Sequence, residues 1–297
     1  MRATLRPAAA LSMDAEVADL LRAGAVLGEV HSVFRRVLNV VTARDRLITF
    51  AAAAMDDAPW TIRVAAPGWP ADQLAAGMPA VLTVHGATAG AISVTFDTVT
   101  KWYAKSIQLP LDRPILAARA RLLDDLLARC GVPGGMLEGA ATPFEAAVGI
   151  RLRQGRTALT QALRRDDAEA VRRAIEGLVG LGPGLTPAGD DFLAGLALVA
   201  AQPGSRNARF PGLAAEVLDR RPSATTLLSA TTLREALRGR ARESLLDLLH
   251  QLVHGDGGAD LADAVARVAA IGHTSGTDLL SGVATGLHLE SEMRGSV

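Results

Sequence analysis

Short runs of apolar residues dominate the first third of the chain. They are rich in β-branched residues and are separated by Pro, Gly and Asp, a pattern that favours short strands. Between Gly24 and about Pro114 they read AVLGEVHSVF, RLITFAAAAM, WTIRVAAP, AVLTVHG and AISVTFDTV. We therefore expect a β-rich module in the N-terminal part of the chain.

Beyond Pro114 the apolar positions recur with the period of a helix. In ILAARARLLDDLLARC, one stripe contains Ile115, Ala118, Leu122 and Leu126, while arginines and aspartates lie elsewhere. The same pattern predicts further helices almost to the end of the sequence, at residues 143–154, 157–165, 167–178, 191–201, 225–238, 242–254, 259–269 and 278–289.

Strands followed by helices predict an α+β fold. We place a β-rich N-terminal module at residues 1–115 and a mainly helical domain at residues 116–297. The helical domain carries two Gly-rich segments that resemble each other and that we interpret as repeated loop-helix units.

The first Gly-rich segment is GLGPGLTPAGDDFLAGLALVAA, and it holds far more Gly and Pro than a helix start requires. The second is IGHTSGTDLLSGVATGL. Gly189–Ala197 and Gly276–Ala284 share the pattern Gly-x-Asp-x-Leu-x-Gly-apolar-Ala. Gly195 and Gly282 each lie one turn into a helix, where Gly costs about 1 kcal/mol relative to Ala unless another backbone packs closely. We therefore predict that the two helices cross at these glycines and bring both loops together.

Composition and charge narrow the classes of function. The chain is 49% hydrophobic and 21% charged, and its 31 basic residues balance 31 acidic ones, which argues for a globular protein and against a nucleic-acid or membrane-surface partner. No apolar stretch approaches the roughly 18 residues of a membrane span. Cys130 is the single cysteine, which excludes a disulfide framework within the chain and a zinc site built on several thiolates. We expect a cytoplasmic protein.

The glycine loops suit a small anion. Backbone N–H groups can line a concavity there, and the helix that follows adds a partial positive charge. Neither a Walker loop nor a G-x-G-x-x-G fingerprint is present, so no specific nucleotide family is indicated. The candidate binding residues are Gly182, Gly184, Thr186, Gly189, Asp190, Thr274, Ser275, Gly276 and Thr277.

Two adjacent aspartates conflict with an anion at this place. Like charges about 4 Å apart repel by roughly 4 kcal/mol at an effective dielectric constant near 20, whereas a helix terminus contributes only about 0.3–2 kcal/mol. Three arrangements resolve the conflict. Asp190 caps the helix while Asp191 faces away, or Asp191 and Asp278 hold a Mg²⁺ ion that bridges to the anion, or the carboxylates bind an amide or guanidinium group.

Histidines supply the remaining candidates. His273 lies inside the second loop and is a candidate proton carrier, so it joins Asp191 and Asp278 as a catalytic candidate. His250 and His254 have the spacing of a metal pair on one helical face, but no third strong ligand follows, and we interpret them as surface or capping residues.

The two Gly-rich segments, in this order, resemble the hallmark segments of the AllH-like family. GEVHSVFRRVLNVVT is similar to the opening strands of that family, and ATTLLSATTLREALRG to the segment before its last helices. The commoner family form has serine at the position of Ala188.

The resemblance implies a subunit of oxamate carbamoyltransferase in purine (allantoin) degradation. That assembly interconverts oxamate plus carbamoyl phosphate with oxalurate plus phosphate, and two companion subunits are expected, one related to acyl-CoA synthetases. Both substrates are small anions that carry amides, so N–H donors and carboxylates in one pocket would each find a partner. Arginines are the expected clamps, and Arg234 and Arg238 are the candidates.

Two other interpretations stay open. In one, the chain is a magnesium-dependent phosphate- or nucleotide-binding protein whose metal is held by Asp191 and Asp278. In the other, it is a non-catalytic structural subunit whose glycine loops dock against a partner. No cofactor is required by the sequence, with Mg²⁺ as the one candidate.

Overall fold

The chain divides into two compact units, Met1–Ala104 and Lys105–Val297, which are described in turn. The structure is a computed structural model that describes residues 8–70, 73–90, 92–139, 142–255 and 258–295. Among these residues, no helix is both long and apolar enough to cross a membrane.

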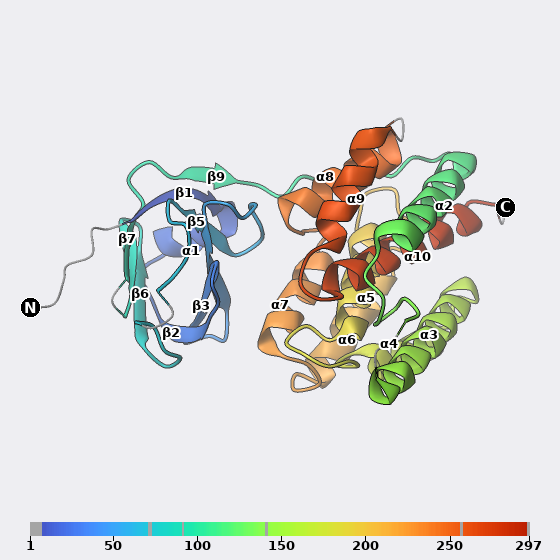
Figure 1. Ribbon diagram of the computed structural model, residues 1–297, viewed down its shortest axis with the longest axis horizontal. Coiled ribbons are helices and arrows are strands. Elements are labelled where there is room, and N and C mark those ends of the chain that lie inside the picture. Colours follow the sequence, from blue (N-terminus) through green and yellow to red (C-terminus); the bar gives the residue numbers. More distant parts are fainter. Residues whose placement is uncertain (1–7, 71–72, 91, 140–141, 256–257, 296–297) are drawn as a thin grey trace, which may run out of the picture. The chain divides into compact units, whose positions relative to one another are not determined.

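The first unit is a closed β-barrel with one short helix (Figure 1). Its strands are β1 (Ala8–Asp14), β2 (Val26–Val33), β3 (Val37–Thr42), β4 (Leu47–Ala52), β5 (Thr61–Val64), β6 (Pro79–Thr83), β7 (Gly86–Ala89), β8 (Ile92–Thr95) and β9 (Thr100–Trp102). The order β5-β4-β3-β2-β6-β7-β8-β1 closes where β1 also pairs with β5, and β9 lies beside β1. The strand-rich character was predicted from the sequence, but the closure into a barrel was not.

The barrel closes through β1, for which the sequence analysis predicts no strand. β1 pairs antiparallel with β5 and parallel with β8, and it leads directly into helix α1 (Ala15–Arg22). Asp14 caps α1 by accepting a hydrogen bond from the Glu16 N–H, and its other oxygen accepts the Trp60 N–H at 2.7 Å. One buried carboxyl therefore fixes both the helix start and the approach to β5.

The second unit is helical. Its helices are α2 (Arg113–Cys130), α3 (Pro143–Arg164), α4 (Ala168–Leu178), α5 (Ala188–Ala200), α6 (Phe210–Arg220), α7 (Leu227–Ala236), α8 (Glu243–His254), α9 (Ala259–Ala269) and α10 (Ser275–Met293). The chain before α2 is attached to this unit, because the Ile107 N–H donates to Gln202 Oε1 and the Leu109 N–H to the Pro203 carbonyl, each at 2.9 Å.

Two helix predictions are wrong. Residues 143–154 and 157–165 were predicted as separate helices, but α3 runs through Gly155 without a break. That glycine serves packing instead, since a Cβ added there would lie 2.6 Å from a methyl group of Leu178 in α4. Helix α6, whose short stretch begins with Phe210 and Pro211, was not predicted from the sequence.

Helices α5 and α10 cross in direct backbone contact at the centre of the helical unit (Figure 1). A Cβ added to Gly195 would lie 1.9 Å from the carbonyl oxygen of Leu279, and one added to Gly282 would lie 2.0 Å from that of Phe192. The crossing predicted from the two glycines is therefore present. Every residue of α5 is buried, so this crossing lies in the core.

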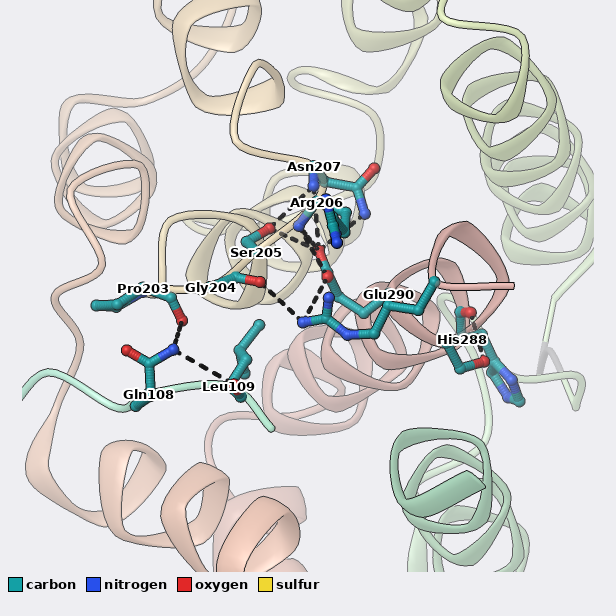
Figure 2. A network of polar contacts seen from close by, with 11 residues as sticks. Gln108, Leu109, Pro203, Gly204, Ser205, Arg206, Asn207, His288 and Glu290 are labelled. Atoms are coloured by element: carbon teal, nitrogen blue, oxygen red, sulfur yellow. Dashed lines mark hydrogen bonds and ion pairs between the residues drawn. The ribbon is translucent and has the colours of Figure 1, made fainter. Parts of the chain in front are cut away.

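Figure 2 shows how the far end of α10 is held. Glu290 is fully buried, and its carboxylate accepts hydrogen bonds from the Ser205 hydroxyl, the Arg206 N–H and the N–H and side-chain amide of Asn207. Arg294 pairs with the same carboxylate at 3.3 Å. Because this charge is surrounded by donors, it fixes the loop after α5 to the end of α10.

The crossing makes a direct stability prediction. Gly282→Ala is expected to lower the free energy of unfolding by roughly 3 kcal/mol, because overpacking costs about 1–3 kcal/mol and the obstacle here is backbone that cannot rotate away. Urea unfolding measures the change. Gly177→Ala in α4 is the matched control, because a Cβ there meets nothing within 4 Å. It should stabilise by up to about 1 kcal/mol. Equal effects of the two substitutions would contradict the account of the crossing.

Candidate functional site

Asp190 does not cap α5, so the first of the three arrangements is wrong. The helix begins earlier, with Pro187 at the N-cap, and Asp190 lies inside its first turn. Its carboxyl accepts hydrogen bonds from the Gly180 N–H and the Ser229 hydroxyl, each at 2.8 Å, and from the Thr225 hydroxyl. Asp190 therefore joins both ends of the first glycine loop (residues 179–187) to the start of α7.

The tip of the first glycine loop is open. Gly182 and Gly184 have φ values of +126° and +94°, which other residues rarely adopt. A Cβ on Gly184 would meet nothing within 4 Å, and the neighbouring Leu185 is 54% exposed. The Thr226 hydroxyl holds the Leu185 carbonyl at 2.6 Å. Glycine is needed at the tip because of its positive φ angles rather than because of tight packing.

Gly189 and Gly276 make matching contacts at the bases of the two loops. A Cβ on Gly189 would lie 2.1 Å from the carbonyl oxygen of Leu178, at the end of α4. One on Gly276 would lie 1.9 Å from that of Val268, near the end of α9. Each glycine thus lets its loop turn tightly between one helix and the next. Neither glycine has room for a ligand at its α-carbon, which makes their part in the site structural.

The two loops meet through side-chain hydroxyls. Thr186 Oγ1, from the first loop, lies 2.9 Å from Oγ of Ser275, the first residue of α10. Both hydroxyls are near enough to the carboxyl of Asp191 to stabilise its ionised form, and that carboxyl is close enough to Asp278 for the two charges to interact. The structure therefore brings Thr186, Asp191, Ser275 and Asp278 together, although they are far apart in the sequence.

A third glycine-rich segment, which the sequence analysis missed, lies against this pair. We call residues 131–139, between α2 and α3, the α2–α3 loop. Its Met136 N–H donates to Asp278 Oδ1 at 2.6 Å, and its Val132 N–H donates to the Thr277 hydroxyl at 2.9 Å. A Cβ on Gly135 would lie 2.2 Å from Asp278 Oδ1, so the glycine backbone rests directly on the carboxyl. The run Gly134–Gly135 was the available signal, but nothing in the sequence links it to Asp278.

Burial changes the protonation of both carboxyls. The pKa of Asp191 is raised to about 8, mainly by desolvation and to a smaller extent by the neighbouring charges of Asp278 and Asp190, while Ser275 and Thr186 oppose the shift. Desolvation also raises the pKa of Asp278 to about 6, against hydrogen bonds from the Met136 N–H and the Thr274 hydroxyl. At neutral pH the pair therefore carries one proton, mainly on Asp191.

That proton reduces the electrostatic conflict seen in the sequence, because only one of the two carboxyls is then charged. A neutral Asp191 does not repel an anion and can donate a hydrogen bond to it. The Oδ2 atoms of Asp191 and Asp278 have no hydrogen-bond partner among the described residues, although both are buried. Buried polar atoms without partners are uncommon and mark places where a ligand or a water belongs.

The arrangement does not favour a metal centre. Among the described residues, no group of three or more His, Cys, Asp and Glu side chains could hold a metal ion. The carboxyl of Asp190 already accepts hydrogen bonds from the first glycine loop. Of the other two aspartates, Asp191 has the higher pKa. A Mg²⁺ ion at Asp191 and Asp278 would have to displace that proton and take its other ligands from hydroxyl groups or water.

Several candidate residues lie elsewhere or have other partners. His273 is exposed, and no hydrogen bond joins its ring to another described residue, so its catalytic role stays a prediction. His250 and His254 have ring centroids 5.0 Å apart and lie on the exposed side of α8. Arg234 and Arg238 form ion pairs with Asp219 and Glu235 respectively, and neither is shown at the carboxyl pair.

Two family models match the chain. The one described as oxamate carbamoyltransferase subunit AllH matches residues 178–287, which contain both glycine loops, α5 and most of α10. The one described as the AllH family N-terminal domain matches residues 9–101, which span the barrel. No solved structure matches the chain significantly.

Stability should fall with rising pH because of the carboxyl pair. The folded protein holds these protons more tightly than the unfolded chain, in which Asp titrates near 3.8, so the stabilisation present at low pH is lost as the pH rises to about 8. Relative to the wild type, Asp191→Asn should gain free energy of unfolding steadily as the pH rises from about 4 to about 8, and the gain should level off above about pH 8. Asp125→Asn, which removes an exposed carboxyl from α2, should follow the wild type. A variant Asp191→Asn with the pH profile of the wild type would contradict the raised pKa.

Asp190 should matter for folding. Asp190→Ala leaves three donors without their acceptor, and because a buried unsatisfied donor costs about 1–3 kcal/mol, we expect a loss of roughly 3 kcal/mol in the free energy of unfolding. Asp190→Asn keeps one acceptor oxygen and should lose less. Urea unfolding at neutral pH measures the two variants. An Asp190→Ala variant as stable as the wild type would show that this carboxyl does not stabilise the fold.

Proposed function

The chain belongs to the AllH family, and we propose that it takes part in carbamoyl transfer to oxamate as one subunit of a larger enzyme. The observation that carries this proposal is the buried pair Asp191 and Asp278, which holds a single proton at neutral pH and joins the two glycine loops. A pair of titrating groups with different pKa values is what acid–base chemistry at neutral pH requires.

The pair suits substrates that combine an anionic group with an amide. Carbamoyl phosphate and oxamate both have this character. A protonated Asp191 can donate to a phosphate or carboxylate oxygen, and an ionised Asp278 can accept an amide N–H. The unpartnered Oδ2 atoms supply the positions for both contacts.

In the proposed reaction, the amide nitrogen of oxamate attacks the carbamoyl carbon and gives up a proton to Asp278. The bond from that carbon to the phosphate oxygen breaks, and Asp191 gives its proton to the departing phosphate. A proton then moves from Asp278 to Asp191 and restores the starting state. The two carboxyls thus act as general base and general acid, and the loops supply orientation.

Partners and pathway belong to the same proposal. The name of the family model describes a subunit, which supports a role among partner subunits. We propose two companion subunits and a place in purine degradation. Exposed Leu185 at the tip of the first glycine loop, and the exposed ring of His273 in the second loop, would then face either substrate or a companion chain.

Calorimetric titration of the full chain with carbamoyl phosphate, and with inorganic phosphate for comparison, tests the proposal. We expect specific binding of carbamoyl phosphate that weakens by roughly tenfold or more in Asp191→Ala, which loses the donor to the anion, and in Asp278→Asn, which loses the charged acceptor. Asp191→Asn keeps an N–H donor and should bind nearly as the wild type does. Asp125→Asn should bind as the wild type does.

Three outcomes would overturn parts of the proposal. Binding that requires added Mg²⁺ would replace the proton-sharing pair by a metal site. Binding that survives both Asp191→Ala and Asp278→Asn would place the anion elsewhere. Absence of binding in all conditions would show that this chain holds no autonomous site and that the loops dock against a companion subunit.

A further inference from the structure

A small cavity lies between the α2–α3 loop and the first turns of α3. Its volume is about 150 Å³, which is room for a molecule of a few heavy atoms, since one water occupies roughly 30 Å³ in the liquid. The cavity is lined by Gly134, Gly135, Leu137, Glu138, Gly139, Glu145, Ala146, Ile150 and Arg153. It therefore shares Gly135 with the covering of the Asp278 carboxyl.

Arg153 is the one cation among these lining residues. A Cβ on Gly149 would lie 3.1 Å from an Nη1 atom of Arg153 and 3.5 Å from the Gly135 carbonyl oxygen, so the guanidinium and the glycine loop converge over Gly149. Gly135 therefore lies between Arg153 and Asp278, with its carbonyl oxygen on the Gly149 side and its α-carbon against the Asp278 carboxyl. Asp278 itself does not line the cavity.

The negative charges beside Arg153 are either weakly held or already occupied. Glu138 Oε1 lies 3.9 Å from Arg153 Nε, and the Glu138 side chain is 86% exposed, so this contact competes poorly with a better-placed anion. Glu145 Oε2 accepts the Thr142 N–H at 3.0 Å in the capping box of α3. The N-terminal end of α3 adds a partial positive charge on this side of the cavity.

We infer that this cavity binds the carboxylate end of a small anion that also carries an amide, with Arg153 as its ion-pair partner and the backbone of Gly134–Gly135 as the wall that faces the amide. The class of ligand rests on the proposed function, in which oxamate is the acceptor. A planar guanidinium can hold a carboxylate through two parallel hydrogen bonds, which also fixes the direction of the rest of the molecule. Leu137 and Ile150 form the apolar walls.

Titration of the full chain with oxamate tests the inference. Arg153→Ala should weaken binding by roughly tenfold or more, and Arg153→Lys should give an intermediate affinity because it keeps the charge but loses the paired hydrogen bonds. Arg151→Ala is the matched control, because Arg151 is an exposed arginine of the same helix that does not line the cavity. It should bind within about twofold of the wild type.

A neutral probe and a charge variant sharpen the test. Oxamide has the size of oxamate but no carboxylate, and its binding should not depend on Arg153. Glu138→Gln should tighten oxamate binding, because it removes the competing carboxylate. Equal oxamate affinities of the wild type and Arg153→Ala would overturn the inference, as would a wild-type chain that does not bind oxamate.

The pattern of loss distinguishes this inference from the proposed function. If oxamate affinity falls in Asp278→Asn but not in Arg153→Ala, the carboxyl pair takes part in binding and the cavity is not the oxamate subsite. If it falls in Arg153→Ala but not in Asp191→Asn or Asp278→Asn, the cavity binds the anion and the pair does not take part in holding it. If the chain binds carbamoyl phosphate but does not bind oxamate, the proposed role in carbamoyl transfer is retained and the cavity is not the oxamate subsite.

Discussion

The backbone contact between α5 and α10 is the constraint on which the helical unit depends. Gly195 and Gly282 let the two helices approach until the carbonyl oxygens of one chain segment occupy the place of a side chain on the other. Such an approach leaves little freedom in the crossing, and it fixes where the first turn of each helix lies. Asp191 and Asp278, one turn before the two glycines, are thereby brought to the same place.

Burial of this carboxyl pair costs free energy unless it retains a proton. The protein supplies hydroxyl donors from Thr186, Ser275 and Thr274 and one backbone donor from Met136, but these do not offset the desolvation. The raised pKa values are the result. At the other end of α10, the buried carboxyl of Glu290 is surrounded by hydrogen-bond donors from the loop after α5 (Figure 2). One end of the helix is built for stability, and the other retains unsatisfied oxygens.

The sequence predicted those parts of the fold that depend on local pattern. Matched glycines revealed the crossing because a helical Gly needs a packing reason, and periodicity revealed most helices. Closure of the barrel was missed because β1 pairs with strands distant in sequence. A capping role for Asp190 was one of the arrangements considered, and its actual partners could not be found from the local sequence, because Thr225 and Ser229 lie far along the chain, just before and within α7. The contact between Gly135 and Asp278 also joins residues far apart in the sequence, so no local pattern predicts it.

Infrared spectroscopy of the carboxyl groups tests the central claim most directly. If Asp191 and Asp278 share one proton, the folded chain at about pH 7 should show the carbonyl band of a protonated carboxyl, and that band should disappear in Asp191→Asn and fade as the pH rises past about 8. A spectrum that lacks the band at neutral pH, or in which Asp191→Asn leaves it unchanged, would contradict the account.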